Sequence, residues 1–521
     1  MASINQDSIN QAVWDTANTF RNVIDPAQYK DYILVPLFWR YMSDVWADHY
    51  DAHKARYGDD EERVARRMAN ERFVLPEGTS FHDIHAQRNA DNIGERINIA
   101  LEAIEEANKL KLRGILTQVD FNASSNLGET REKNRRLKQL LEDFAKPALD
   151  LRPSRFGGDE VVRDVVGEAY IATIAHFAAD AGKKAGEFYT PRAVSELLVR
   201  LVRPRPGMTV CDPACGSGTL LLRAADEVSA YARREGLPEN EGRNVLLAGQ
   251  EVNRSTAGLA KMNMFLHGQD SARIEVGNTI TAPALLTDDS LTRFDIVVAN
   301  PPFSLKKWGL EEAEKDRHNR FHRGLPPASK GDYAFVSHMI ETAKPLTGRI
   351  GLIAPHGVLF RGAREGVIRR KLVEENLLDA VVGLPAQLFP TTGIPVCIMV
   401  LDRAREKGGA RADADTVTFV DASRDFAPGR RMNQIGAEQI ERVLAAVASG
   451  EAQERYSAVV TREEIAANGY NLNTPRYVDT FEPEPEVDLD AVQAEIDGLE
   501  RQLAEVRGRM AGYMRELGYG G

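Results

Sequence analysis

The chain has 521 residues, of which 43% are hydrophobic and 27% charged, and this ordinary composition excludes a disordered or fibrous protein. The first ten residues, "MASINQDSIN", carry no basic-then-apolar signal segment, and no apolar run approaches the roughly 18–20 residues of a membrane span. The net charge of −11 argues against nonspecific nucleic-acid binding by this chain alone, because phosphate contacts supply most of that affinity.

Residues 1 to about 155 are predicted to form a helical domain. Apolar residues recur there at spacings of three and four, which defines one face of a helix. The first such set is Val13, Ala17, Phe20 and Ile24. Further helical stretches are expected at 101–112 and 137–144.

Residues 156–480 are predicted to form an α/β domain. Short apolar runs alternate there with helical patterns, which indicates a mostly parallel sheet with helices on both faces. The expected strands are 208–211, 245–249, 273–276, 294–299, 349–354, 378–383 and 396–401. The loop between the last two, "LPAQLFPTTGIP", is too short for a helical crossover, so we expect an antiparallel hairpin. Residues 406–480 are mixed, with a helix expected at 437–448.

The segment "TVCDPACGSGTLLLRAADEV" (209–228) has the pattern of a strand, a tight turn and a helix. Glycine in such a turn lets the backbone approach a ligand closely. Ligands of open α/β sheets bind at this position, outside the carboxyl ends of the strands. The candidate cofactor-binding residues of this turn are Asp212, Gly216, Ser217, Gly218 and Thr219.

This turn fits S-adenosylmethionine better than a dinucleotide. The dinucleotide fingerprint is G-x-G-x-x-G, and Leu221 stands where its third glycine would be. The carboxylate of Asp212 would repel a pyrophosphate but suits a ligand with a cationic amine. S-adenosylmethionine carries an ammonium and a sulfonium, so we expect it as the cofactor. The cysteines Cys211 and Cys215 have no clustered histidines nearby, so we expect no metal and a reducing, cytoplasmic setting.

The next two strands also end in polar side chains. The second, "VLLAGQEVN", ends in Glu251, whose carboxylate can accept both ribose hydroxyls. The third, "RIEVGNTI", ends in Asn278, within reach of the adenine edge of a cofactor. One acidic residue at a strand end is weak evidence, but three consecutive strand ends with suitable groups strengthen the prediction.

Upstream, "GEFYTPRAVSELLVRLV" (186–202) is predicted to be a loop followed by an amphipathic helix. Thr190 before Pro191 has the pattern of a helix N-cap followed by proline at the first position. Alternatively, the loop Glu187–Arg192 covers the methionine end of the cofactor. The residues alone leave both interpretations open.

The fourth strand runs into Asn300-Pro301-Pro302-Phe303. The exocyclic amine of adenine is a poor nucleophile, and two acceptors for its hydrogens would favour the tetrahedral geometry that methylation requires. The Asn300 side-chain oxygen and the Pro301 carbonyl, held rigidly by consecutive prolines, can be these acceptors. Phe303 can stack on a base that has been flipped out of the duplex. The alternative is a strand-ending turn with an incidental aromatic.

Residues 482–488, "EPEPEVD", are predicted to be an acidic linker. A helix at 486–518 follows, with apolar residues alternately three and four apart, as in a coiled-coil seam of about four heptads. This helix either folds back on its own domain or docks on a helix of a partner. The seam residues are Leu489, Val492, Ile496, Leu499, Leu503, Val506, Met510, Tyr513 and Leu517.

Together these motifs resemble those of N6-adenine DNA methyltransferases, and most closely the modification subunit of type I restriction-modification systems. The resemblance covers nearly the whole chain. It is carried by "YKDYILVPLFWRYMSD" (29–44), "EFYTPR" (187–192), "DPACGSGTLL" (212–221), "GQEVN" (249–253), "GNT" (277–279), "FDIVVANPPFS" (294–304), "KGDYAFVSHMI" (330–340), "GRIGLIAPHGVLF" (348–360) and "LPAQLFPTTGIPVCIMVLD" (384–402).

The resemblance implies an α/β fold with a seven-stranded, Rossmann-like sheet of the S-adenosylmethionine-dependent methyltransferase type. It also implies an antiparallel last strand, a helical N-terminal domain and a C-terminal coiled-coil helix. The positions that match cofactor contacts of the family are Glu187, Phe188, Tyr189, Thr190, Pro191, Arg192, Ser217, Gly218, Thr219 and Glu251. The catalytic motif corresponds to Asn300, Pro301, Pro302 and Phe303.

The resemblance also implies partners. Two such subunits join one specificity (S) subunit, which reads double-stranded DNA, and a restriction (R) subunit can accompany them. The helical N-terminal domain helps to close around DNA, and the C-terminal helices dock on the specificity subunit. Such a partner would explain how a chain with a net charge of −11 acts on DNA. Basic stretches at 306–307, 317–323 and 361–371 are candidate phosphate contacts or solvated charged faces.

Two other functions remain open at this level. The chain could methylate protein glutamine or RNA, since Asn-Pro-Pro-aromatic motifs serve planar amides and amines generally; Phe303 and the helical flanks argue against this. It could also be a non-catalytic scaffold, but Asp212, Glu251 and Asn300 are intact. A fused restriction enzyme is disfavoured because we find no convincing nuclease segment or helicase P-loop.

Overall fold

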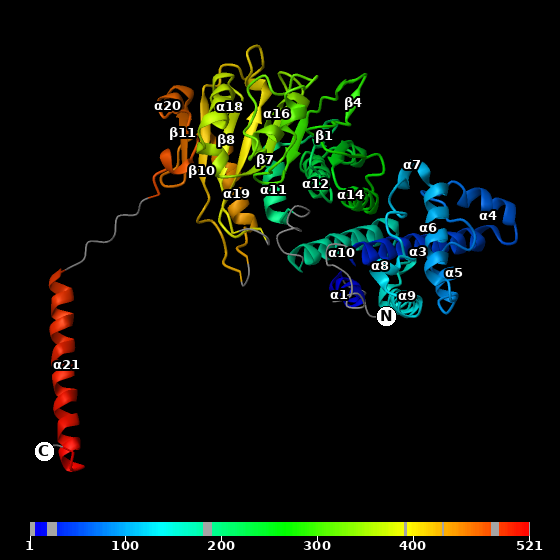
Figure 1. Cartoon of the computed structure of the whole chain (residues 1–521), viewed down its shortest axis with the longest axis horizontal. Coiled ribbons are helices and arrows are strands. Elements are labelled where there is room, and N and C mark those ends of the chain that lie inside the picture. Colours follow the sequence, from blue (N-terminus) through cyan, green and yellow to red (C-terminus); the bar gives the residue numbers. More distant parts are fainter. Residues whose placement is uncertain are drawn as a thin grey trace. The chain divides into compact units, whose positions relative to one another are not determined.

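The computed structural model describes residues 6–17, 29–180, 190–389, 393–429, 432–480 and 489–519. The chain divides into two compact units, Met1–Val478 and Asp479–Gly521. The first unit contains a helical region and an α/β region, and the second contains a long helix, α21 (Figure 1). Within the described residues, none of the helices combines the length and the apolar character that crossing a bilayer demands.

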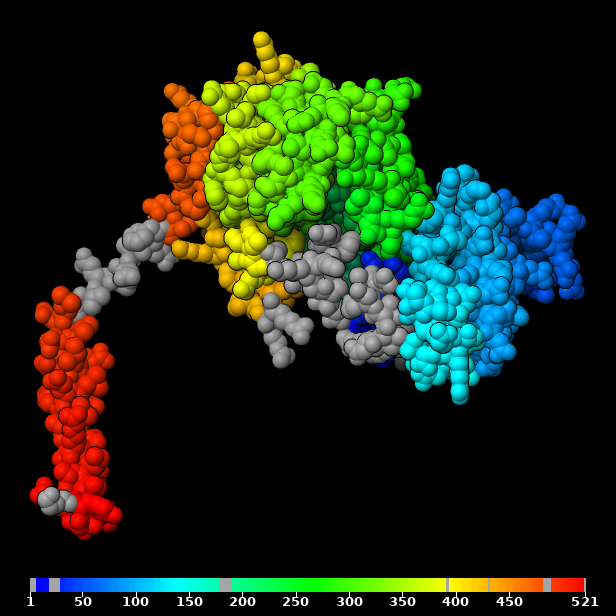
Figure 2. Space-filling model, viewed as in Figure 1, coloured from blue at the N-terminus to red at the C-terminus, as the bar shows by residue number. Residues whose placement is uncertain are grey.

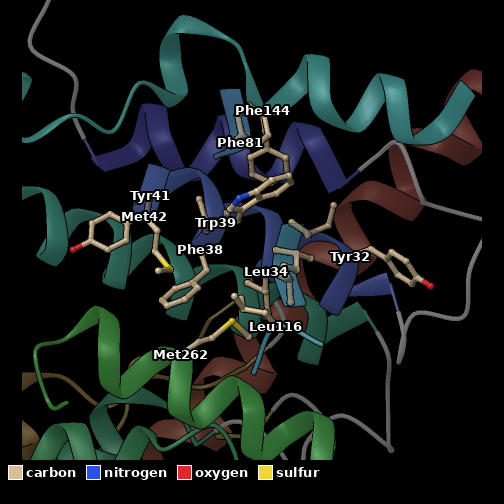
Figure 3. Close-up of a cluster of buried hydrophobic side chains, with 14 of the residues drawn as sticks. Tyr32, Leu34, Phe38, Trp39, Tyr41, Met42, Phe81, Leu116, Phe144 and Met262 are labelled. Atoms are coloured by element: carbon tan, nitrogen blue, oxygen red, sulfur yellow. The ribbon is translucent and has the colours of Figure 1, made fainter. Parts of the chain in front are cut away.

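The helical region begins the first unit. Its helices are α1 (Gln6–Ala17), α3 (Asp31–Tyr57), α4 (Glu61–Met68), α5 (Phe81–Ala86), α6 (Ile93–Ala107), α7 (Lys109–Leu112), α8 (Ser124–Leu127), α9 (Thr130–Phe144) and α10 (Asp159–Asp180). Figure 3 shows part of their core, where Trp39, Phe81 and Phe144 lie together. Val166 and Tyr170 of α10 enter the same core. The packing of this region therefore extends beyond the boundary expected at residue 155.

The α/β region is built, within the described residues, on a sheet of nine strands. In spatial order these are β11 (Ser457–Thr461), β10 (Thr416–Asp421), β8 (Leu378–Gly383), β9 (Val396–Asp402), β7 (Arg349–Pro355), β6 (Ile296–Ala299), β1 (Thr209–Asp212), β2 (Leu246–Glu251) and β3 (Arg273–Val276). Neighbours are parallel, except that β9 runs antiparallel to β7 and β8, and β11 to β10. A separate hairpin joins β4 (Leu286–Thr287) and β5 (Ser290–Leu291).

The predicted methyltransferase-type sheet is confirmed and is larger than expected. All seven predicted strands are present within two residues of their predicted bounds. The antiparallel pairing of β8 with β9 is confirmed. β10 and β11 were not predicted; they extend one edge of the sheet from the segment expected to be mixed. Apolar runs as short as these do not distinguish a strand from a buried piece of helix.

Helices cover both faces of the sheet (Figure 1). Successive strand side chains point to opposite faces, so Val210 and the next residue, Cys211, enter different cores. One face carries α11 (Arg192–Val202), α12 (Thr219–Arg234), α14 (Arg254–Leu266) and α19 (Ala437–Ser449), and the other α16 (Asp332–Thr342), α18 (Ala363–Glu374) and α20 (Arg462–Ala467). Shorter helices are α13 (Glu239–Gly242), α15 (Leu310–Ala313) and α17 (Gly357–Phe360).

The second unit contains α21 (Leu489–Glu516), the predicted C-terminal helix. The linker predicted at 482–488 falls on residues 481–488, which lie outside the described part of the chain. None of the described residues of α21 is buried, and its seam is exposed along its length; Leu499 and Leu503 are 58% and 49% exposed.

Candidate active site

Polar side chains meet at one edge of the sheet. Asp212 is the last residue of β1, Glu251 is the last residue of β2, and Asn300 directly follows β6. Because β6, β1 and β2 are adjacent and parallel, their carboxyl ends lie side by side. Asn278 follows β3, which pairs with β2. The fold thus brings together the strand-end residues that the sequence singles out.

Glu251 supports the turn that follows β1. Its Oε2 accepts a hydrogen bond from the backbone N–H of Gly216 at 3.1 Å, and its Oε1 accepts one from Asn253 at 2.8 Å. Gly218 has a φ of 82°, in the left-handed region that favours glycine. A Cβ there would lie 2.5 Å from the Met264 methyl group, so glycine also allows α14 to approach.

Asp212 is a buried carboxyl group, only 1% exposed. Its Oδ1 accepts a hydrogen bond from the backbone N–H of Ala214 at 2.9 Å. Burial raises the pKa of Asp212 to about 8; the Ala214 N–H opposes this rise, and the Glu251 carboxylate adds to it. A cationic ligand would restore the ionised form, because an opposite charge nearby lowers the pKa of a carboxyl group.

Neighbouring side chains order the same turn. The hydroxyl oxygens of Ser217 and Thr219 lie 3.1 Å apart. From α14, Asn263 Nδ2 donates to the Ser217 carbonyl at 2.9 Å. Asn278 Oδ1 accepts from the backbone N–H of Ile280 at 2.9 Å, so this oxygen shapes its own turn. What Asn278 can offer a ligand is its amide N–H, a donor that matches the acceptors of an adenine edge.

Thr190 orients the amide of Asn300. Asn300 Nδ2 donates to Thr190 Oγ1 at 2.9 Å. Asn300 Oδ1 is buried and has no hydrogen-bond partner among the described residues. A buried acceptor left without a partner is costly, and such exceptions call for an explanation. The amide is therefore arranged to accept a hydrogen bond from a bound group.

Phe303 is half-buried rather than fully exposed. Its ring meets that of Phe389 edge-on, with centroids 6.2 Å apart and planes inclined by 78°. Upstream, β6 ends at Ala299, so Pro301 and Pro302 lie outside the sheet. The motif thus presents a rigid backbone and a fixed aromatic ring at the end of a central strand.

Sequence reasoning missed the carboxylate that holds the end of this motif. Ser304 has a φ of 52°, which is uncommon for a residue with a side chain. Its N–H donates to Asp332 Oδ1 at 2.7 Å, and Lys330 Nζ donates to its hydroxyl at 3.0 Å. Arg361 Nη2 in turn donates to Asp332 Oδ2 at 2.5 Å. The signal for Asp332 was its place in "KGDYAFVSHMI", one of the segments that carry the resemblance.

The loop before α11 is described from Thr190 onward. The predicted contacts Glu187, Phe188 and Tyr189 lie outside the described residues. The predicted N-cap is wrong: α11 begins at Arg192, Pro191 holds the N-cap position, and no described side chain caps the helix. The hydroxyl of Thr190 faces Asn300 instead, because the tertiary contact competes for it. Arg192 Nη1 lies 3.6 Å from a carboxylate oxygen of Glu168 in α10.

The basic stretches predicted as candidate phosphate contacts or solvated charged faces contain both buried and exposed residues. Arg320 is buried and pairs with Asp316 at 2.8 Å. Arg323 is also buried, between two glutamates. Lys306 and Lys307, just after the Asn-Pro-Pro-Phe motif, are exposed. Arg317 and Arg364 are exposed as well, so contact with a phosphate backbone stays a prediction for these four residues.

Two family models match the chain. The model described as N-6 DNA Methylase matches residues 161–486, which is more than half of the chain. The model described as HsdM N-terminal domain matches residues 9–144, which include most of the helical region.

Individual relatives are similar over nearly the whole chain. The sequence is 28% identical over 551 residues to the type I restriction enzyme MpnII methylase subunit of Mycoplasma pneumoniae, covering 98% of this chain and 96% of that protein. It is 29% identical over 528 residues to the type I restriction enzyme MjaVIII methylase subunit of Methanocaldococcus jannaschii, covering 99% of this chain and 85% of that protein. Among solved structures, the crystal structure of a type I restriction-modification system methyltransferase subunit from Streptococcus thermophilus has a TM-score of 0.77 and a sequence identity of 31%. The match covers 92% of this chain and 100% of that chain.

Proposed function

Because this chain belongs to the N-6 DNA methylase family, as a type I restriction-modification methyltransferase subunit, we propose that it methylates the N6 amine of adenine in DNA. The base would be flipped out of the duplex, since an exocyclic amine inside the stack cannot reach the sheet edge. Methylation of protein glutamine or RNA, and a purely structural role, are not favoured by this membership.

The methyl donor in this proposal is S-adenosylmethionine, held at the carboxyl ends of β1, β2 and β3. Its sulfonium would supply the methyl group. Asp212 would face the cationic amine, whose positive charge would lower the raised pKa of this buried carboxyl group and favour its ionised form. Glu251 would accept the ribose hydroxyls, and the Asn278 amide N–H would meet the adenine edge. The remaining proposed contacts are Gly216, Ser217, Gly218, Thr219 and the loop residues Glu187, Phe188, Tyr189, Thr190, Pro191 and Arg192.

The observation that carries the proposal is the orientation of the Asn300 amide. Its Nδ2 is engaged by Thr190, so its buried Oδ1 is the atom that can accept a hydrogen from the target amine. The Pro301 carbonyl would accept the second hydrogen. Two such acceptors favour a tetrahedral nitrogen, which then loses one proton after gaining the methyl group. Phe303 would support the base by stacking.

The proposed complex contains double-stranded DNA, a specificity subunit, a second copy of this chain and, where present, a restriction subunit. The relatives are methylase subunits of type I enzymes, which supports this assignment. A net charge of −11 is consistent with a subunit that relies on partners to grip DNA. The target sequence would then be read by the partner.

The test is Asn300→Ala in the complex with its specificity subunit. We expect methyl transfer to fall by at least about 100-fold, because an acceptor used in the transition state is lost. The Kd for S-adenosylmethionine should stay within about twofold, since Asn300 is not among the cofactor groups. Nucleoside mass spectrometry measures the rate and identifies N6-methyladenine, and calorimetry measures the Kd.

Asn244→Ala is the matched control, since this exposed asparagine precedes β2 and lies away from the carboxyl ends of the strands. Asn244→Ala should change neither the rate of methyl transfer nor the Kd for S-adenosylmethionine. Loss of cofactor binding in Asn300→Ala would contradict the role assigned to Asn300. A methylated base other than adenine would contradict the proposed substrate.

A further inference from the structure

Helix α14 connects the cofactor turn to the helical region. Ala257 and Met264 on one side of α14 pack in the core beside the sheet. On its other side, Met262 and Phe265 belong to the core of the helical region. Figure 3 shows Met262 lying beside Leu116, a residue of that region. In the space-filling view, the green surface of this part of the chain adjoins the blue surface of the N-terminal helices (Figure 2).

The same helix carries groups that hold the cofactor turn. At its start, the backbone N–H of Asn253 donates to Glu251, and its side chain caps α14 by accepting from Thr256 at 3.1 Å. Three turns along, Asn263 donates to the carbonyl of Ser217. A displacement of α14 would therefore move both Glu251 and the turn after β1.

The helical region reaches the first turn of α14 through Asp31. Asp31 is the first residue of α3, and its Oδ2 accepts a hydrogen bond from Ser255 Oγ at 2.7 Å. Its Oδ1 is buried, and no residue in the described part of the chain donates to it. Burial raises the pKa of Asp31, while Lys30 and the Ser255 hydroxyl act in the opposite direction. This carboxyl group is thus placed at the junction at a cost in desolvation.

We propose that Asp31 is a positioning residue for S-adenosylmethionine, although it belongs to the helical region. Asp31 holds the first turn of α14 through Ser255, and α14 is tied to Glu251 and to the turn after β1. This inference rests on the proposed function. Cofactor affinity then depends on the contact between the two regions and, reciprocally, bound cofactor strengthens that contact.

The experiment measures the Kd for S-adenosylmethionine by calorimetry on the full chain. The variants are Asp31→Ala, Ser255→Ala and the double variant. Each single change should weaken binding roughly tenfold, the effect of losing one hydrogen bond to a charged group. The double variant should be no weaker than Asp31→Ala, because both changes remove the same bond. Ser255→Ala removes the donor of this hydrogen bond, which lies on α14, and leaves the Asp31 carboxyl group in place.

The matched control is the ion pair at the other end of α14. Arg72 Nε donates to Asp270 Oδ2 at 2.7 Å, and the guanidinium lies 3.9 Å from the centroid of the Phe265 ring. Asp270→Asn weakens the same junction without touching the first turn of α14. Its Kd should stay within about twofold of that of the unchanged chain.

A second measurement separates positioning from a general loss of structure. Hydrogen exchange at the amides of Gly216 and Asn253, which donate to Glu251, should quicken in Asp31→Ala but not in Asp270→Asn. Unchanged Kd values in folded Asp31→Ala and Ser255→Ala chains would overturn the inference. So would an equal loss of affinity in Asp270→Asn. If the unchanged chain binds no S-adenosylmethionine, the proposed function itself fails, and that result is distinct from a selective effect of the variants.

Discussion

At the scale of single residues, the orientation of one amide decides what the Asn-Pro-Pro-Phe motif can do. An asparagine side chain has a donor end and an acceptor end, and an acceptor is what a target amine needs. Thr190 engages the donor end of Asn300 and leaves Oδ1 buried within the site. The motif and the loop before α11 therefore act as one unit, although 110 residues separate their partners in sequence.

Asp212→Asn should stabilise the cofactor-free chain and weaken cofactor binding. The folded-state pKa of about 8 lies above the ordinary value, so the folded chain keeps a proton that the unfolded chain has lost at neutral pH. This group therefore favours folding least at high pH, and stability falls as the pH rises from about 4 toward 8. Asparagine removes this dependence, so the gain in unfolding free energy should be about 2–4 kcal/mol larger at pH 8 than at pH 5.

Denaturant unfolding at the two pH values measures this difference, and calorimetry measures the loss of S-adenosylmethionine affinity. Asn278→Ala, which alters the end of β3 without removing a charge, should show no such pH dependence. A gain from Asp212→Asn that is equal at pH 5 and pH 8 would mean that burial does not raise the pKa of Asp212.

At the scale of elements, the loop after β6 is held by segments that follow it in the chain. The first residue of α16, Asp332, accepts the N–H of Ser304, and Arg361, between α17 and α18, donates to the same carboxylate. These contacts stabilise the left-handed backbone at Ser304, directly after Phe303. The position of the Asn-Pro-Pro-Phe motif is thus set by the start of α16 and by Arg361 before α18, as well as by the strand that leads into it.

Asp332→Ala should reduce methyl transfer roughly 10- to 100-fold, because small displacements of reacting groups are costly. The Kd for S-adenosylmethionine should be unchanged, since Asp332 contacts none of the proposed cofactor groups. Glu365→Gln is the control: it alters the other carboxylate on Arg361 but leaves the bond from Ser304 intact. A similar loss of rate in both variants would indicate a general destabilisation of this face instead.

Elements were predicted from the sequence where their signals are local. The seven strands follow from apolar runs that end in glycine, proline or polar residues, and Asp212, Glu251 and Asn300 stand out as strand-end residues for the same reason. β10 and β11 have runs of six and five residues in a segment of mixed pattern, and runs this short do not distinguish a strand from a buried piece of helix. The N-cap at Thr190 was predicted from a valid local preference, but the tertiary partner Asn300 takes up its hydroxyl.

At the scale of the whole molecule, α21 presents its apolar seam without burying any of its described residues. An exposed seam of this regularity is suited to a second helix. We expect Leu499→Asp combined with Leu503→Asp to abolish co-purification with the specificity subunit. The melting temperature of the chain and its cofactor affinity should not change, because these side chains are already exposed.

Light scattering after size-exclusion chromatography measures the mass of the complex with the specificity subunit. The matched control is Gln502→Asp, which lies outside the seam. A complex that survives the double change would exclude the seam as the docking surface. Both chains are also measured without the specificity subunit. If the doubly substituted chain then has a lower mass than the unchanged chain, the seam joins two copies of this chain.

By itself, the sequence determined the order of helices and strands, the glycine turn after β1 and the polar residues at the strand ends. These depend on apolar periodicity and turn residues within short windows. The tertiary structure alone decided that the Asn300 Nδ2 is engaged by Thr190, that Asp332 accepts the N–H of Ser304, and that α14 joins the turn after β1 to the helical region. Each of these depends on contacts between distant residues, such as Asp31 and Ser255, which are 224 positions apart. Local patterns cannot encode such contacts, because they form only when packing brings the segments together.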